Sequence, residues 1–191
     1  MLEAGQVFES PRGGTRVVVR ENSPERISIE RTLPPSSGGG PGSKHRHTQT
    51  NESFELLRGA ASATVGKREH PLAPGEVLDI PLGVEHVNPH TGGDETATIV
   101  QTVTPGTRAV EVYFDSWLHW LHEGQTLDNG EPTTLQLAAI TKEGGFGGTW
   151  LAGVPVFLQR LGLPLLGIVA RLTGTRAIRV PERRDPERAP G

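Results

Sequence analysis

The chain has 191 residues, a formal net charge of −3 and no cysteine. This length allows one domain with a hydrophobic core and an extension, and the lack of cysteine excludes disulfide bonds. The weakly acidic charge gives no sign of the basic face that a nucleic-acid-binding protein needs. The 25 glycines and 16 prolines are typical of many short strands joined by turns.

The N-terminal part of the sequence predicts strands and a loop. Its first residues, Met1 to Gly5, have neither the basic nor the apolar region of a secretory signal, so we expect a cytoplasmic protein. Alternating or β-branched residues predict strands at 5–9, 15–20 and 26–33. The following segment, 34–43, is rich in Pro, Ser and Gly and predicts a loop that leads into a histidine-containing strand.

That strand carries two histidines two residues apart. Because side chains alternate across a strand, His45 and His47 point to the same side of an extended segment. Glu52 begins a second alternating run, in which it shares one face with Phe54 and Leu56. A carboxylate among apolar side chains is costly unless it is paired or binds a metal. These residues therefore indicate a metal site.

A third histidine follows further along a series of predicted strands. His86 comes shortly after the turn Pro81-Leu82-Gly83. Imidazoles with one carboxylate suit iron, manganese, nickel, copper or zinc, and the absence of a thiolate argues against a structural zinc site. Many short strands at this spacing predict a barrel or sandwich that can enclose a small cavity. The predicted strands of this region are 52–58, 60–66, 76–80, 84–88 and 95–103.

These residues resemble the two signature motifs of the cupin superfamily. The first motif matches at Gly39, His45, His47, Glu52 and Gly59, and the second at Gly75, Pro81, Gly83 and His86. The resemblance implies a mainly β fold, a double-stranded β-helix or jelly-roll barrel, with C-terminal α-helices behind it. It also implies one divalent transition metal per chain, with iron favoured over manganese, nickel, copper or zinc. The implied metal ligands are His45, His47, Glu52 and His86.

One position departs from the family pattern. The second motif usually closes with Asn four residues after its histidine, and this chain has His90 there, with Asn88 two residues earlier. Both residues are candidates for contact with a substrate. We predict the same role for Phe54 and Gln101.

Beyond the predicted barrel, the apolar spacing becomes helical. Helices are predicted at 109–123 and 133–142. The most apolar stretch, 150–173, is interrupted by prolines and an arginine, which argues against a membrane-spanning helix. We predict two short helices there, meeting near 162–164.

The predicted organisation is a cupin barrel at 1–112, a helical extension at 113–180 and a disordered tail at 181–191. The extension is expected to pack on the barrel or on a dimer partner, because a monomer rarely exposes so large an apolar stretch. Since cupins commonly pair, we expect a homodimer.

Three functions remain open for this fold and metal site. The favoured one is an iron dioxygenase-like oxidoreductase that acts on a small organic substrate, with Glu52 also serving as the catalytic base. The second is a non-redox metal-dependent isomerase, cyclase or lyase. The third is a small-molecule binding protein without catalysis.

Overall fold

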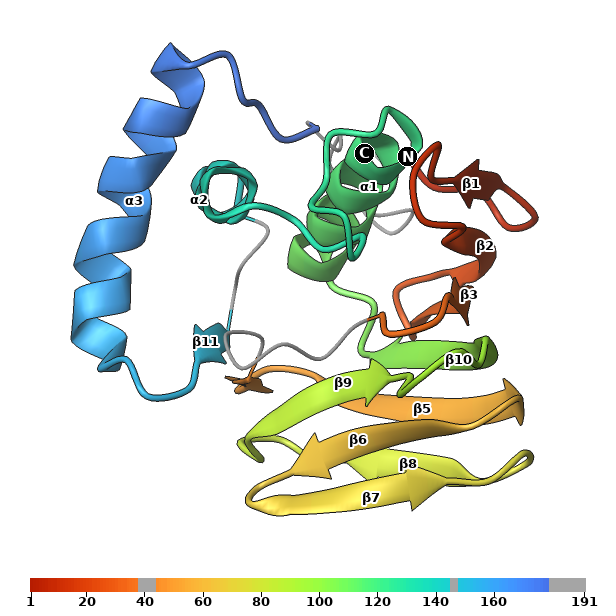
Figure 1. Ribbon diagram of the computed structural model, residues 1–191. Coiled ribbons are helices and arrows are strands. Elements are labelled where there is room, and N and C mark those ends of the chain that lie inside the picture. The colour runs from red at the N-terminus through yellow and green to blue at the C-terminus, as the bar shows by residue number, and fades with distance from the viewer. Residues whose placement is uncertain (38–43, 145–147, 179–191) are drawn as a thin grey trace, which may run out of the picture.

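The computed structural model describes residues 1–37, 44–144 and 148–178. Within these ranges the chain forms two antiparallel sheets and three helices (Figure 1). The predicted mainly β fold with C-terminal helices is confirmed. Gly39 of the first motif and the predicted tail at 181–191 lie outside the described residues.

The strands of the two sheets interleave along the sequence. The first sheet consists of β1 (Val7–Glu9), β2 (Arg16–Asn22), β3 (Ile27–Leu33), β10 (Ala97–Thr104), β5 (Asn51–Arg58) and β8 (Val77–Ile80), in that spatial order. The second consists of β11 (Thr149–Leu151), β4 (His45–His47), β9 (His86–His90), β6 (Ala61–Val65) and β7 (Arg68–Leu72). The four strands β3-β10-β5-β8 lie against β4-β9-β6-β7. This order is that of a double-stranded β-helix, or jelly roll.

Apolar side chains from both sheets meet in the barrel interior. Phe54 and Leu56 of β5 and Ile99 of β10 contribute from the first sheet, and Ala61 and Leu72 from the second. Burial alternates with a period of two along β5, and β10 pairs with β5 so that Gln101 lies opposite Phe54. Glu52 and Gln101 therefore share the inward face of Phe54 and are both buried.

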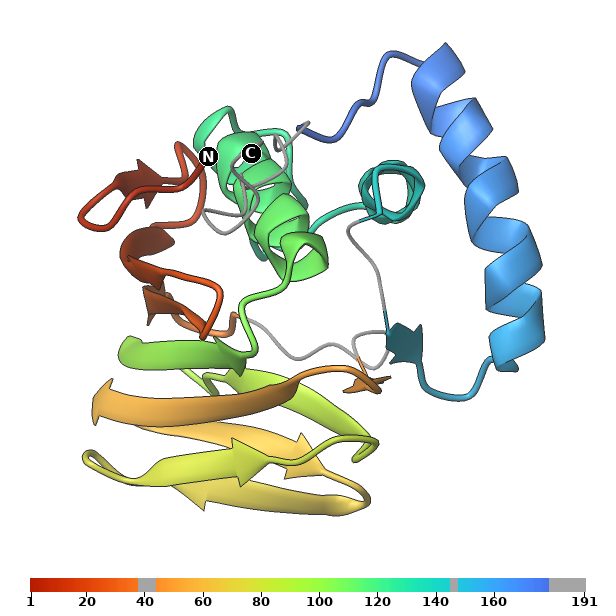
Figure 2. The ribbon, with the colours of Figure 1, turned by 180° about the vertical axis from the view of Figure 1, so that it is seen from behind.

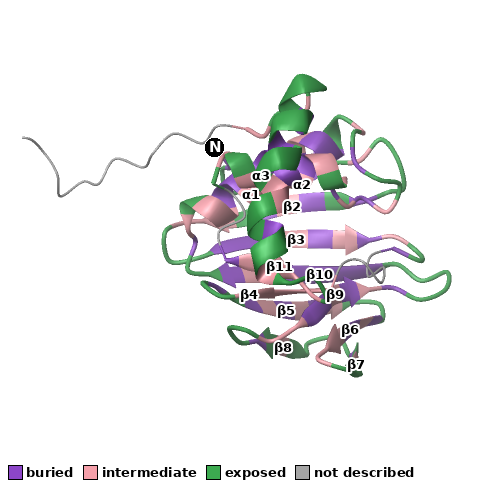
Figure 3. Ribbon diagram, turned by 90° about the vertical axis from the view of Figure 1, so that its left-hand side faces the viewer, coloured by how far each residue is buried: buried purple, intermediate pink, exposed green. Residues whose placement is uncertain are grey.

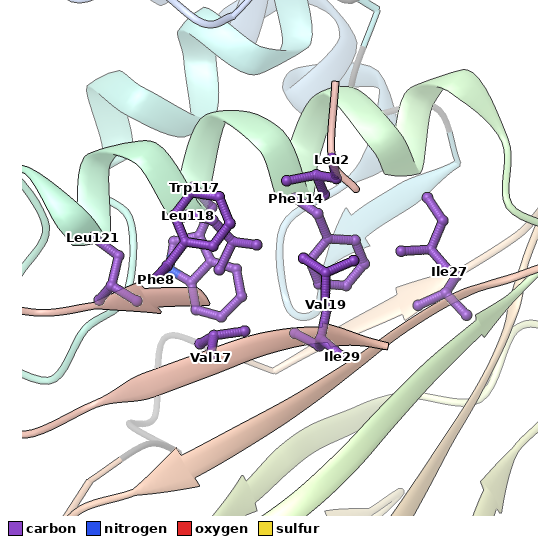
Figure 4. Close-up of a cluster of buried hydrophobic side chains, with 11 residues drawn as sticks. Leu2, Phe8, Val17, Val19, Ile27, Ile29, Phe114, Trp117, Leu118 and Leu121 are labelled. Carbon is purple, nitrogen blue, oxygen red and sulfur yellow. The ribbon is translucent and has the colours of Figure 1, made fainter. Parts of the chain in front are cut away.

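A second core joins α1 (Arg108–His122) to the outer part of the first sheet. Figure 4 shows Phe114, Trp117 and Leu118 of α1 packed over Val17 and Ile29 of the strands. Thr107 caps the helix by accepting a hydrogen bond from the Val110 amide. The predicted helix at 109–123 is thus confirmed, and the predicted domain boundary at residue 112 falls inside it.

Trp117 anchors the connection that follows α1. Its indole Nε1 donates to the Gly130 carbonyl at 2.8 Å. The guanidinium of Arg31 lies 5.0 Å from the centre of the indole ring and pairs with Glu131 at 3.0 Å. A buried arginine on β3 is therefore neutralised by the loop that α1 holds in place.

The second helix, α2 (Thr134–Lys142), lies between α1 and α3 (Figure 2). Thr133 and Gln136 form a capping box at its N-terminus. The predicted helix at 133–142 is confirmed. Ile140 packs with Trp120 of α1 and Ala170 of α3. These side chains pack α2 against both α1 and α3. None of the described helices is long and apolar enough to cross a membrane.

The third helix corrects one prediction. The sequence predicts two short helices meeting near Pro164, but α3 runs without a break from Val156 to Leu172. Pro164 removes one backbone donor, and because its side chain is exposed, water can reach the carbonyl left without a partner. Gly167 allows the helix to approach α2 so closely that a Cβ there would lie 2.9 Å from the Ala138 carbonyl oxygen.

Every predicted strand is present, with small shifts at its ends, and two further strands were not predicted. The edge strand β7 has a polar sequence containing Pro71, a residue that strands tolerate at a sheet edge. The other, β11, has only three residues and follows a helix in sequence. Its pairing with β4 brings the C-terminal part of the chain to the barrel.

Candidate metal centre

Three strands bring the predicted ligands together. His45 and His47 come from β4, Glu52 from β5 and His86 from β9. The antiparallel register of β4 and β9 makes His45 and His86 direct Cα partners. The centres of their imidazole rings lie 4.4 Å apart, and those of His47 and His86 lie 5.3 Å apart.

The donor atoms of these four residues converge on one point. One donor atom from each residue can be chosen so that all lie within 4.8 Å of one another. Glu52 Oε2 lies 2.9 Å from His86 Nε2 and 3.2 Å from His47 Nε2. Glu52 and His86 are only 3% and 0% exposed, so the carboxylate stays shielded from bulk water.

The outer nitrogens of two imidazoles have partners of their own. His86 Nδ1 lies 3.0 Å from the Val84 carbonyl oxygen, which can only accept a hydrogen bond. His86 therefore carries a proton on Nδ1 and directs Nε2 to Glu52. His47 Nδ1 lies 2.9 Å from Thr149 Oγ1, which suits the same tautomer. Such outer hydrogen bonds orient imidazole ligands in metal sites.

This arrangement fits a cation. A neutral His86 would turn the lone pair of Nε2 toward the carboxylate of Glu52, and the two acceptors would repel each other at 2.9 Å. A metal ion between them would accept both lone pairs, and a set of imidazoles with one carboxylate suits a transition metal. The residues present therefore fit the metal that the motif resemblance implies.

The same geometry shifts two pKa values in the metal-free protein. Burial opposes ionisation of Glu52, but hydrogen bonds from His47 and His86 outweigh it and hold the pKa of that carboxyl below its usual value. Burial also opposes the charged form of His86, but the hydrogen bond and charge of Glu52 outweigh it and raise the pKa of the imidazole. Both shifts favour a positive charge next to the carboxylate.

The strand order and the four converging donors together decide the assignment of the fold. The protein has the cupin fold. Solved structures to which it is similar cover about half of this chain. A predicted oxalate decarboxylase from Thermotoga maritima has 17% identity and a TM-score of 0.45, over 55% of this chain and 99% of that one.

Two further solved structures are similar over the same region. KdgF from a Halomonas species has 15% identity and a TM-score of 0.43, over 53% of this chain and 87% of that one. An RmlC-like cupin from Shewanella frigidimarina has 18% identity and a TM-score of 0.42, over 55% and 86%. No protein-family model and no curated protein sequence matches the chain.

The predicted substrate-contact residues lie at different places in the cupin barrel. Gln101 is next to the site, where its Nε2 donates to Glu52 Oε1 at 2.5 Å. Phe54 is 1% exposed and belongs to the barrel core. Asn88 and His90 lie on β9, where Asn88 Oδ1 and His90 Nδ1 are buried without a hydrogen-bond partner among the described residues. His90 Nε2 lies 3.9 Å from Glu69 Oε1.

Thr149, which contacts the site from the C-terminal extension, was not predicted, and no motif or periodic pattern marks it. Thr149 is the Cα partner of His47 in the pairing of β11 with β4. Gly148 supports this contact because its carbonyl accepts from the Thr48 amide at 2.7 Å. The extension thus supplies a hydroxyl that orients a metal-ligand imidazole, although it lies about a hundred residues beyond that histidine.

We expect Thr149→Val to weaken metal binding by about 10- to 100-fold, the usual contribution of a partner that orients a ligand. Valine keeps the shape of threonine but offers no acceptor to His47 Nδ1. Thr149→Ser should restore most of the affinity. Competition with a chelator at fixed pH measures both values, and affinity unchanged in the valine variant would show that this hydroxyl has no such role.

Proposed function

We propose that the protein is a metal-dependent cupin enzyme, an iron dioxygenase-like oxidoreductase that acts on a small organic substrate. One observation carries the proposal: three imidazoles and a buried carboxylate present donor atoms within 4.8 Å of one another. Histidines with one carboxylate are typical ligands of non-haem iron. When bound, the metal would supply Lewis-acid or redox chemistry at its open coordination positions.

The chain's own residues prepare the site for that chemistry. Val84 and Thr149 hold the Nδ1 protons of the two imidazoles, which leaves each Nε2 as a ligand atom. Gln101 donates to one oxygen of Glu52 and so fixes the plane of the carboxylate. The other oxygen, Oε2, faces the ligand nitrogens. In this proposal Glu52 would be a ligand through Oε2 and, once released from the metal, the base that takes a proton from the substrate at that atom.

The proposed substrate contacts follow from burial and missing partners. Phe54 would form part of the apolar wall that excludes water from the reacting atoms. Asn88 Oδ1 and His90 Nδ1 are buried polar atoms that a polar group of the substrate would satisfy. Gln101 would contact the substrate from beside Glu52, to which its Nε2 donates.

Elemental analysis of the purified protein is the first test. We expect close to one transition metal per chain, and loss of most of it in the double variant His47→Ala with Glu52→Ala. The matched control changes a histidine and a glutamate outside the site, His70→Ala with Glu55→Ala, and should keep the metal. Wild-type protein that is metal-free and cannot be loaded would contradict the site.

The identity of the metal separates the possible activities. Iron together with substrate-dependent oxygen uptake supports the oxidoreductase. Zinc without oxygen dependence would instead favour the non-redox isomerase, cyclase or lyase, and binding without turnover across a substrate panel would favour a binding protein. We also propose a homodimer, while the cytoplasmic location stays a prediction.

A further inference from the structure

The outer face of α3 is apolar, and no other part of the described chain covers it. Gln159, Gly167 and Ala170 are buried on the side that faces α2. The opposite side points away from the rest of the described chain, and most of the helix is exposed in Figure 3. Large apolar residues exposed by 38% to 82% are Val154, just before the helix, and Phe157, Leu158, Leu161, Leu165, Leu166, Ile168, Val169 and Leu172 within it. A helix that is apolar on both sides is normally buried.

The spacing of these residues indicates what kind of surface covers them. Five of them, all within the helix, follow one another at alternating intervals of three and four residues, which is the a/d pattern of a helix that packs against another helix. The residues of this seam are Leu158, Leu161, Leu165, Ile168 and Leu172. A long, straight helix is the partner that fits this seam.

We propose that the seam binds the same seam of a second copy, with the two α3 helices antiparallel. In such a pair the a positions of one helix face the d positions of the other, so a two-fold axis sets Leu158 opposite the partner's Ile168. Leu161 then lies opposite the partner's Leu165. The face is complementary to itself, as a two-fold dimer requires.

The charges on α3 favour the antiparallel arrangement. Its only charged residues are Arg160 and Arg171, which both lie outside the seam. In an antiparallel pair, Arg171 lies beside the partner's Phe157, where a guanidinium can stack on the ring. In a parallel pair, Arg160 would lie beside the partner's Arg160 and Arg171 beside the partner's Arg171, and these like charges would repel each other.

The size of the face agrees with a stable dimer. If each of the nine exposed side chains leaves on the order of 60 Å² of apolar surface in water, the face offers roughly 500 Å². A standard interface buries about 800 Å² per partner, of which somewhat more than half is apolar. The apolar area of the face is therefore close to the apolar area that one partner buries in a standard interface.

The dimer would also fix the strand that supports the metal site. The Gln159 side chain accepts from the Leu151 amide and donates to the Leu151 carbonyl, both at 2.9 Å. It thereby ties α3 to β11, which carries Thr149. This proposal deepens the proposed homodimer and does not depend on the identity of the metal.

The mass in solution tests the proposal. Light scattering of the full chain should give the mass of two copies, and Leu161→Glu with Leu165→Glu should give one. The matched control, Leu127→Glu, changes a leucine that is 49% exposed outside α3 and should stay a dimer. An unchanged circular dichroism spectrum would show that the variants are folded. A wild-type monomer, or a double variant that remains a dimer, would overturn the proposal.

Cysteine cross-linking tests the orientation, because the chain has no cysteine of its own. An equimolar mixture of Leu158→Cys and Ile168→Cys chains should form a disulfide-linked dimer, while neither variant alone should do so. Cross-linking of each variant alone would contradict the antiparallel pair. Wild-type monomer that pellets with anionic phospholipid vesicles, and no longer does so in the double variant, would overturn the dimer and assign the face to a membrane surface.

Discussion

Glu52→Gln is expected to abolish tight metal binding although all three imidazoles remain. Glu52 is the one anionic member of the four-residue set, and its Oε2 contacts the Nε2 atoms of both His47 and His86. Glutamine has the same shape but no charge. Its amide would direct either the NH2 group, which cannot bind a metal, or the carbonyl oxygen, which is a weaker ligand, toward the metal position. We expect the affinity to fall by more than about 100-fold, the upper limit for partners outside the ligand set.

Glu55→Gln is the matched control for this variant. Glu55 lies on the same strand, three residues from Glu52, and is partly exposed. Its substitution removes the same charge from β5 without touching the site, so affinity should stay within about twofold of the wild type. Calorimetric titration with iron(II) or manganese(II) measures both variants. If Glu52→Gln bound as tightly as Glu55→Gln, Glu52 would not be a ligand.

The ligand residues were predictable because their spacing is local. Histidines two residues apart on a strand share a face, and Glu52 heads a run whose inward positions are otherwise apolar. His45 and His86 are about forty residues apart in the sequence, and local patterns do not predict that their strands pair in this register. The motif resemblance supplied that contact, and the strand order of the barrel agrees with it.

The extension was less predictable because distant contacts determine it. A three-residue segment such as β11 has too few residues for a periodic signal, and it becomes a strand by pairing with β4. Pro164 indicated a break in the helix, yet the packing of Gly167 and Ala170 against α2 outweighs one lost hydrogen bond. Local propensity also could not show that no described residue packs on the outer face of α3.

Gly59→Ala is expected to destabilise the barrel far more than Gly75→Ala, although both glycines belong to the cupin motifs. Both adopt a positive φ, +80° at Gly59 and +85° at Gly75, which costs a residue with a Cβ about 1–2 kcal/mol. Their surroundings differ. A Cβ at Gly75 would meet no atom within 4 Å, whereas one at Gly59 would overlap the Thr96 carbonyl oxygen and lie 2.9 Å from Ala97 Cα.

The difference between the two variants isolates the steric part of the effect. The atoms that a Cβ at Gly59 would meet belong to the backbone at the start of β10, so they can move only if the pairing of that strand shifts. Such crowding costs a further 1–3 kcal/mol or so, and Gly59→Ala should lose about 2–5 kcal/mol of unfolding free energy in urea. Gly75→Ala should lose only about 1–2 kcal/mol, because the backbone angle alone is strained there. Equal losses would mean that the approach of Thr96 does not require glycine, and that this motif position reflects only the turn.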